Sequence, residues 1–152
     1  MKFEQYKLVK EHALAAVQAA GVSLPEAGSM NPVLLAYVGD VVFSLYVRLR
    51  FLAASSHVRV IHDLSSKAVS AVYQAKALAA LMDTLSEQEL AVVKRGRNTK
   101  SSVPKSASVH EYRMSTAFEA LVGWLFLNNE DERLGKIMEQ AFNIIIDDFK
   151  TK

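Results

Sequence analysis

Apolar residues recur at spacings of three and four along almost the whole chain, which is the period of a helix with one buried face. The alternation of apolar and polar residues that marks a half-buried strand is scarce, and only three prolines interrupt the helical pattern. The sequence therefore predicts an all-α fold. The expected helices cover about residues 3–20, 32–54, 57–64, 65–82, 86–96, 112–128 and 131–149.

Several of these helices carry residues that normally begin or end a helix. Gly21 follows the first helix, where a glycine can serve as the C-cap. Asn31 is placed to cap the second helix, and Pro32 then occupies the first helical position, where a missing backbone N–H has no cost. Ser86 and Glu89 have the spacing of a capping box. These residues support the helix boundaries independently of the apolar pattern.

The composition excludes several classes of protein. Hydrophobic residues make up 51% of the 152 residues, which is enough for a sizeable core and excludes a disordered chain. With no cysteine and four scattered histidines, disulfides and cysteine zinc sites are excluded, and oxygen ligands are the expected metal chemistry. No apolar run of about 18 residues is free of charge, and the N-terminus does not read as a signal peptide. We expect a soluble, cytoplasmic protein with no membrane partner.

Two acids interrupt the most apolar helices. Residues 34–47 are apolar on every face apart from Asp40, and such a helix is expected in the centre of a domain. An ionised carboxylate there is unfavourable unless it is paired, hydrogen-bonded or bound to a cation. Glu119 is the only charge in residues 117–127. Each acid has a glycine nearby, Gly39 and Gly123, and such small residues would let another helix or a ligand approach closely.

A lone buried acid is often a core residue that pairs with an arginine or caps a helix. Two acids in two central helices, each close to a glycine, favour a different interpretation. If the helices pack together, the two carboxylates could converge on a hard divalent cation, whose usual ligands are oxygens, water and substrate phosphate. We therefore expect Asp40 and Glu119 to form a Mg²⁺ or Mn²⁺ site.

The positive charge of the chain is concentrated in one segment. Residues 94–113 hold six basic residues and one acid, a net charge of +5, whereas the whole chain carries +2. Such a run on its own is most often a solvated loop. Here it precedes the helix with Glu119, and its serines, threonine and asparagine add neutral hydrogen-bonding groups suited to a phosphate backbone. Basic side chains next to a metal ion that is bound by carboxylates are an arrangement suited to an enzyme that cleaves phosphodiester bonds.

The residues around these acids resemble a known family. Residues 35–48 (LAYVGDVVFSLYVR) are similar to the signature helix of the ribonuclease III catalytic domain, in which an apolar or aromatic pair precedes Gly-Asp and an apolar run. Residues 94–100 (KRGRNTK) and 112–123 (YRMSTAFEALVG) resemble the Mini-III branch, which lacks a double-stranded RNA-binding domain. Residues 65–75 resemble the family's intervening helix. The resemblance covers residues 31–133 in matching order and spacing.

This resemblance implies a ribonuclease III endonuclease-domain-like helical bundle, with residues 1–152 as a single catalytic domain and no separate RNA-binding domain. It implies a homodimer that cuts double-stranded RNA with Mg²⁺, or Mn²⁺ in its place, and matures precursor large-subunit (23S) ribosomal RNA, with a ribosomal protein as a further candidate partner. Asp40 and Glu119 match the catalytic, metal-binding carboxylates, whereas Val33 and Thr116 stand where the general family pattern has acids. The residues that match the family's basic loop, and that we expect to contact RNA, are Lys94, Arg95, Arg97, Asn98, Lys100, Lys105 and Arg113.

Two other functions remain compatible with the same residues. A helical protein of this fold could have lost activity and only bind structured RNA, in which case duplex binding would occur without metal-dependent cleavage. A protein–protein adaptor would use Asp40 and Glu119 as internal salt-bridge partners and would gain no thermal stability from Mg²⁺ or Mn²⁺. The presence of both acids favours the nuclease over the inactive module.

Overall fold

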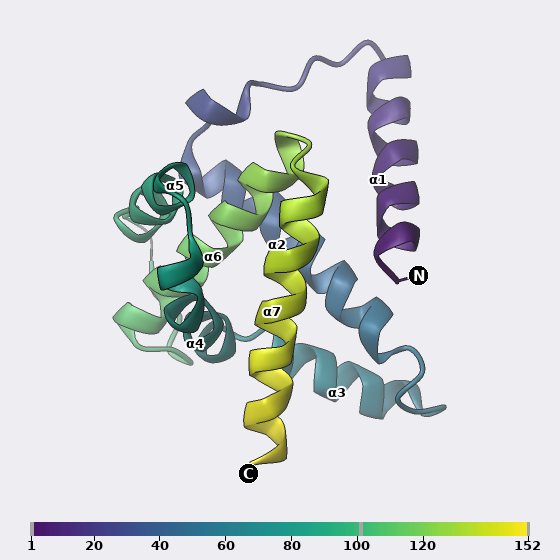
Figure 1. Cartoon of the computed structure of the whole chain (residues 1–152), viewed down its shortest axis with the longest axis vertical. Helices are drawn as coiled ribbons and strands as arrows, with labels where there is room; N and C mark the ends of the chain where they lie inside the picture. Colours follow the sequence, from purple (N-terminus) through teal and green to yellow (C-terminus); the bar gives the residue numbers. More distant parts are fainter. Residues whose placement is uncertain (1, 101, 152) are drawn as a thin grey trace.

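The computed structural model describes residues 2–100 and 102–151, with the side chains of residues 2 and 3 left out. These residues form seven α-helices and two 3₁₀ turns and no strand, which confirms the all-α prediction (Figure 1). The elements in chain order are α1 (Lys2–Ala19), η1 (Ala27–Ser29), α2 (Pro32–Phe51), α3 (Val58–Ala68), α4 (Ala71–Leu81), η2 (Met82–Thr84), α5 (Glu87–Arg97), α6 (Val109–Leu127) and α7 (Asp131–Lys150).

The predicted capping residues occupy the helix ends. Gly21 has a positive φ of 70° after α1, and the side chain of Asn31 accepts a hydrogen bond from the backbone N–H of Val33 at 3.0 Å. Ser86 and Glu89 form the expected capping box at the start of α5. The local sequence thus sets these boundaries by satisfying backbone groups that the helix itself leaves without partners: N–H groups at the starts of α2 and α5, and a carbonyl oxygen at the end of α1, where Gly21 donates to Gln18.

Three predicted boundaries were wrong. α3 continues to Ala68 instead of ending at residue 64, because the extra turn places buried Ser65 and Ala68 on its inner face. α2 ends at buried Phe51, and residues 52–54, which were expected to extend it, are exposed. α6 begins three residues before residue 112, at a second capping box formed by Ser108 and Glu111. That S-x-x-E spacing was readable in the sequence and was missed.

Two glycines bring α2 and α6 into direct backbone contact. A methyl group at Gly39 would overlap the main-chain oxygen of Glu119, and one at Gly123 would overlap the main-chain oxygen of Leu35. The close helix approach predicted from these glycines is therefore confirmed. α6 also packs against α4, α5 and α7, so it is the central helix of the bundle.

Gly96 plays a similar part between α5 and α6. A methyl group there would lie 2.9 Å from the Cα atom of Ala117, closer than real side chains pack. The C-terminal end of α5 consequently packs closely on α6, at a point two residues before Glu119. This end of α5 carries Lys94, Arg95 and Arg97.

The core surrounds α6 and contains aromatic pairs between helices. Phe43 of α2 and Phe118 of α6 meet edge to face with ring centroids 4.9 Å apart, and both are fully buried. Figure 1 shows α7 running along one side of the bundle to the C-terminus. Its apolar face, which includes Leu134, Ile137 and Ile145, is buried in the same cluster. Aromatic pairs of this geometry add stabilisation beyond the burial of their area.

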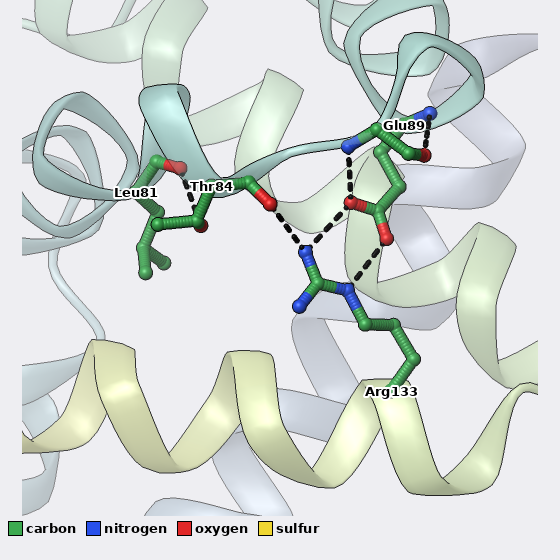
Figure 2. A network of polar contacts seen from close by, with 5 residues as sticks. Leu81, Thr84, Glu89 and Arg133 are labelled. Atoms are coloured by element: carbon green, nitrogen blue, oxygen red, sulfur yellow. Dashed lines mark hydrogen bonds and ion pairs between the residues drawn. The ribbon is translucent and has the colours of Figure 1, made fainter.

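One buried ion pair connects α5 to α7. Arg133 of α7 donates from Nε to Glu89 at 2.6 Å and from a terminal nitrogen to the same carboxylate at 2.9 Å (Figure 2). The terminal nitrogen also donates to the carbonyl oxygen of Thr84 at 2.9 Å. The Arg133 hydrogen bonds lower the pKa of Glu89. Because Glu89 also caps α5, a single carboxylate both starts that helix and holds it against α7.

Lys10 fastens α1 to the bundle. In Figure 1, α1 stands at the edge of the molecule away from α4 and α5. The Lys10 side chain is buried, and its Nζ donates to the carbonyl oxygen of Phe126 at 2.7 Å and to Asp131 at 2.6 Å. A cation at the C-terminus of α6 and an anion at the N-terminus of α7 both complement the helix dipoles.

α2 was expected in the centre of the domain; it packs on the central helix α6 but is not buried on every face. By length and composition α2 could cross a membrane, but core helices of soluble proteins pass the same test. In this structure one face packs on α6, while a second face exposes Leu34, Tyr37 and Val41, with Tyr37 76% exposed. We name these three residues the α2 stripe.

The glycine contact makes a stability prediction. Although alanine is the better helix former, Gly39→Ala and Gly123→Ala should each lower the free energy of unfolding by roughly 3 kcal/mol, because main chain must move to admit the methyl group. Gly28→Ala is the matched control, since nothing lies within 4 Å of its added methyl group, and its effect should stay within about 1 kcal/mol. Urea unfolding curves measure both; equal values for the variants and the control would contradict the packing argument.

Candidate active site

Asp40 and Glu119 lie at the crossing of α2 and α6. Gly39 packs directly on the main chain of Glu119, so the next residue, Asp40, is brought beside it. The two carboxyl groups are close enough for the charge of Asp40 to raise the pKa of Glu119. The structure therefore brings together the two acids that sequence analysis selected.

The two acids differ in their exposure. Glu119 is only partly exposed, and burial raises its pKa to about 8, with the charge of Asp40 as a second cause. Asp40 was expected to be buried and is instead exposed to solvent, where it accepts a long hydrogen bond from Ser44 at 3.5 Å. The difference arises because Asp40 lies near the α2 stripe, whereas Glu119 points between helices.

No cation neutralises this pair in residues 2–100 and 102–151. Neither Asp40 nor Glu119 takes part in a salt bridge there, so the structure gives no support to the adaptor hypothesis with these acids as salt-bridge partners. A third metal-ligating side chain does not join them among the described residues. Two carboxylates that retain solvent access nevertheless suit Mg²⁺ or Mn²⁺, because Mg²⁺ is commonly held by one or two carboxylates together with water and substrate phosphate.

Gln74 of α4 adds an amide group that sequence analysis missed. Its side chain is completely buried, and its Oε1 accepts a hydrogen bond from Ser115 of α6 at 2.5 Å. The Gln74 amide acts on Glu119, whose pKa it lowers against the larger effect of burial. The sequence does contain a signal: Gln74 is a polar residue one turn before Leu78 on the apolar face of its helix.

The predicted RNA-contacting residues all have exposed side chains. Arg95 differs from the others, because its guanidinium donates to the carbonyl oxygens of Met30 at 2.8 Å and Gly28 at 3.5 Å. It therefore holds the loop that leads into α2 while leaving its charge at the surface. The remaining candidates are Lys94, Arg97, Asn98, Lys100, Lys105 and Arg113.

Neither position where the general ribonuclease III pattern has a further acid supplies another ligand. The hydroxyl of Thr116 donates to the carbonyl oxygen of Tyr112 at 3.0 Å, as helix-interior threonines often do. Val33 is an exposed apolar residue in the first turn of α2. The carboxylates at this crossing are consequently Asp40 and Glu119.

The chain is similar in sequence to a family of known proteins. The family model described as the Ribonuclease III domain matches residues 34–130, which include both acids. Mini-ribonuclease 3 from Brevibacillus brevis is 46% identical over 117 residues, covering 76% of this chain and 87% of the relative. Mini-ribonuclease 3 from a Thermoanaerobacter species is 43% identical over 119 residues, covering 77% and 84%.

A solved structure shares the arrangement of helices. The crystal structure of a protein from Fusobacterium nucleatum superposes with a TM-score of 0.72 at 26% sequence identity, covering 76% of this chain and 96% of that one. The family model and the curated relatives, in contrast, name a family. The chain belongs to the ribonuclease III family of endoribonucleases, in its Mini-ribonuclease 3 branch.

Proposed function

We propose that this endoribonuclease hydrolyses phosphodiester bonds of double-stranded RNA in a metal-dependent reaction. The observation that carries the proposal is the pair Asp40 and Glu119, which no cation of the described chain neutralises. The cationic end of α5 packs on the same helix as Glu119, at Ala117 and Ala120. A pair of acids and a group of exposed cations in one domain suit a metal ion and a polyanion together. An inactive RNA-binding module would have no need for the acid pair.

Asp40 and Glu119 would hold Mg²⁺, with Mn²⁺ as a substitute. The bound cation would supply Lewis-acid stabilisation of the charge that develops on the phosphate and the leaving oxygen. The chain itself keeps Asp40 open to solvent, so that phosphate and water can approach, and encloses Glu119 between helices. The pKa of about 8 of Glu119 implies that its carboxyl must release a proton when it becomes a metal ligand.

The exposed basic residues would position the RNA backbone. Lysine and arginine side chains recognise the charge and the shape of the RNA backbone. The base edges are out of reach, because the major groove of A-form RNA is deep and narrow. Recognition should therefore depend mainly on the duplex form. Binding should weaken steeply with salt, because each phosphate contact releases counterions. These contacts are assigned to Lys94, Arg95, Arg97, Asn98, Lys100, Lys105 and Arg113.

We propose that two chains pair through the α2 stripe. Leu34, Tyr37 and Val41 are 53%, 76% and 62% exposed, and contiguous apolar surface of this kind marks an interaction site. In a two-fold dimer the same patch faces itself. Because Asp40 precedes Val41 in α2, such pairing would place the two acid pairs in one assembly, where each could cut one strand of a duplex.

The cellular role proposed is the maturation of precursor 23S ribosomal RNA in the cytoplasm, with a ribosomal protein as a possible component of the substrate. Residues 1–152 would act as one catalytic domain. The dimer surface and the basic residues would hold the duplex. Mapping of the new RNA ends after incubation with precursor ribosomal RNA tests this target.

Removal of either acid should abolish cleavage. Asp40→Asn and Glu119→Gln should each lower the rate on duplex RNA with Mg²⁺ by at least about 100-fold, because each loses a carboxylate ligand. Asp83→Asn, at an exposed acid in η2, is the matched control and should cut at the wild-type rate. Wild-type cleavage by both folded site variants would refute the assignment, and a wild-type protein that binds duplex without cutting it would be the inactive module.

The pH dependence of stability should report on Glu119. Because folding raises its pKa from 4.5 to about 8, its protonation stabilises the native state fully below about pH 4.5, and this contribution is lost as the pH rises through 8. Without metal, the melting temperature should therefore fall from pH 5 to pH 8 more steeply in wild type than in Glu119→Gln. Added Mg²⁺ should raise the wild-type value more at pH 8 than at pH 6. Parallel pH curves for the two proteins would contradict the buried-acid assignment.

A charge in the α2 stripe should prevent dimer formation. Tyr37→Glu would place a carboxylate in the apolar contact, so sedimentation equilibrium should give the monomer mass of 16.8 kDa, against twice that mass for wild type. Val58→Glu is the matched control, because Val58 is 79% exposed on α3. The proposed interface is wrong if Tyr37→Glu remains dimeric.

A further inference from the structure

The buried amide of Gln74 has one polar partner and one unused donor. Its Oε1 is held by the hydroxyl of Ser115, at 2.5 Å. Its Nε2 has no hydrogen-bond partner in the described part of the chain, although the side chain is 0% exposed. A buried donor without a partner destabilises a folded protein, so such groups are rare and each calls for a physical reason.

Gln74 meets the helix that carries Glu119, one turn before that acid. Ser115 and Glu119 are one turn apart on α6 and therefore share a face, and Gln74 reaches that face from α4. Because Ser115 fixes Oε1, the nitrogen is the end of the amide left to act on Glu119. The α4 residues around it, Ala75, Ala77 and Leu78, are buried and apolar and offer no other acceptor side chain.

We propose that Gln74 is a positioning residue for Glu119. Its amide nitrogen donates to the carboxylate and holds that carboxylate in the orientation in which it binds a divalent cation. This inference rests on the proposed function. Carboxylates that ligate metals are usually oriented by such outer hydrogen bonds, and loss of one typically weakens metal binding or activity by about 10–100-fold.

The arrangement also explains why the amide is anchored. A glutamine side chain without this anchor would lose rotational freedom about several bonds when it meets Glu119. The Ser115 hydrogen bond fixes the amide beforehand, so this entropy cost is smaller. Ser115 thus acts on the acid through Gln74. Ser115 of α6 holds Gln74 of α4, and Gln74 in turn holds Glu119 of α6.

The test replaces Gln74 with methionine, which keeps the length and the helix preference and removes the amide. Mn²⁺ binding to the full chain is measured without RNA by electron paramagnetic resonance, and kcat and KM are measured on duplex RNA. Gln74→Met should weaken Mn²⁺ binding at least tenfold and lower kcat at least tenfold, with KM for RNA within twofold of wild type. Mn²⁺ affinity and kcat within twofold of wild type would overturn the proposal.

Two further variants separate positioning from packing. Leu78→Val truncates a fully buried residue one turn along α4, and it should lower the melting temperature while leaving Mn²⁺ affinity and kcat unchanged. Ser115→Ala removes the anchor and should weaken Mn²⁺ binding in the same direction as Gln74→Met, by about threefold or more. If Gln74→Met does not fold, Ser115→Ala decides the question, and unchanged Mn²⁺ affinity in that variant overturns the proposal.

Glu119→Gln distinguishes failure of this inference from failure of the proposed function. If Glu119→Gln binds Mn²⁺ as wild type does, the metal site itself is misassigned. If Glu119→Gln loses Mn²⁺ binding while folded Gln74→Met and Ser115→Ala retain it, the metal site stands and the role of Gln74 is refuted.

Discussion

The contact between Gly39 and Gly123 is the constraint on which the rest of the structure depends. Because neither residue has a side chain, the backbones of α2 and α6 touch, and Asp40 comes to lie beside Glu119. Any side chain at these positions would separate the helices and the two carboxyl groups with them. Gly96 extends the same principle to α5 and brings its cationic end to the same stretch of α6. Three small residues therefore assemble the site from three helices.

The ionised form of Glu119 is unfavourable in this site, and a bound cation would stabilise it. Burial and the neighbouring Asp40 both disfavour the ionised form of Glu119, and no cation of the described chain offsets them. By contrast, Glu89 in the first turn of α5 is buried as well but is paired with Arg133, which lowers its pKa. One acid is satisfied by the protein, whereas the other remains available to an external cation.

The sequence contained much of this arrangement. An acid in each of two apolar helices, each near a glycine, predicted the convergence of Asp40 and Glu119, because helical period and side-chain size are local properties. Exposure was harder to predict, since it depends on which face lacks a neighbour, and Asp40 was therefore wrongly expected to be buried. Contacts between residues far apart in the chain, such as Lys10 with Asp131 and Gln74 with Ser115, leave almost no local pattern.

The hydrogen bonds of Arg95 couple two parts of the molecule that the chain order separates. Its guanidinium binds the carbonyls of Gly28 and Met30, directly before the residue that caps α2, while its helix packs on α6. The start of the Asp40 helix and the cationic end of α5 are thus fastened into one rigid body. Under the proposed function, one arginine would therefore both add positive charge to the RNA-contacting surface and hold the start of the helix that carries Asp40.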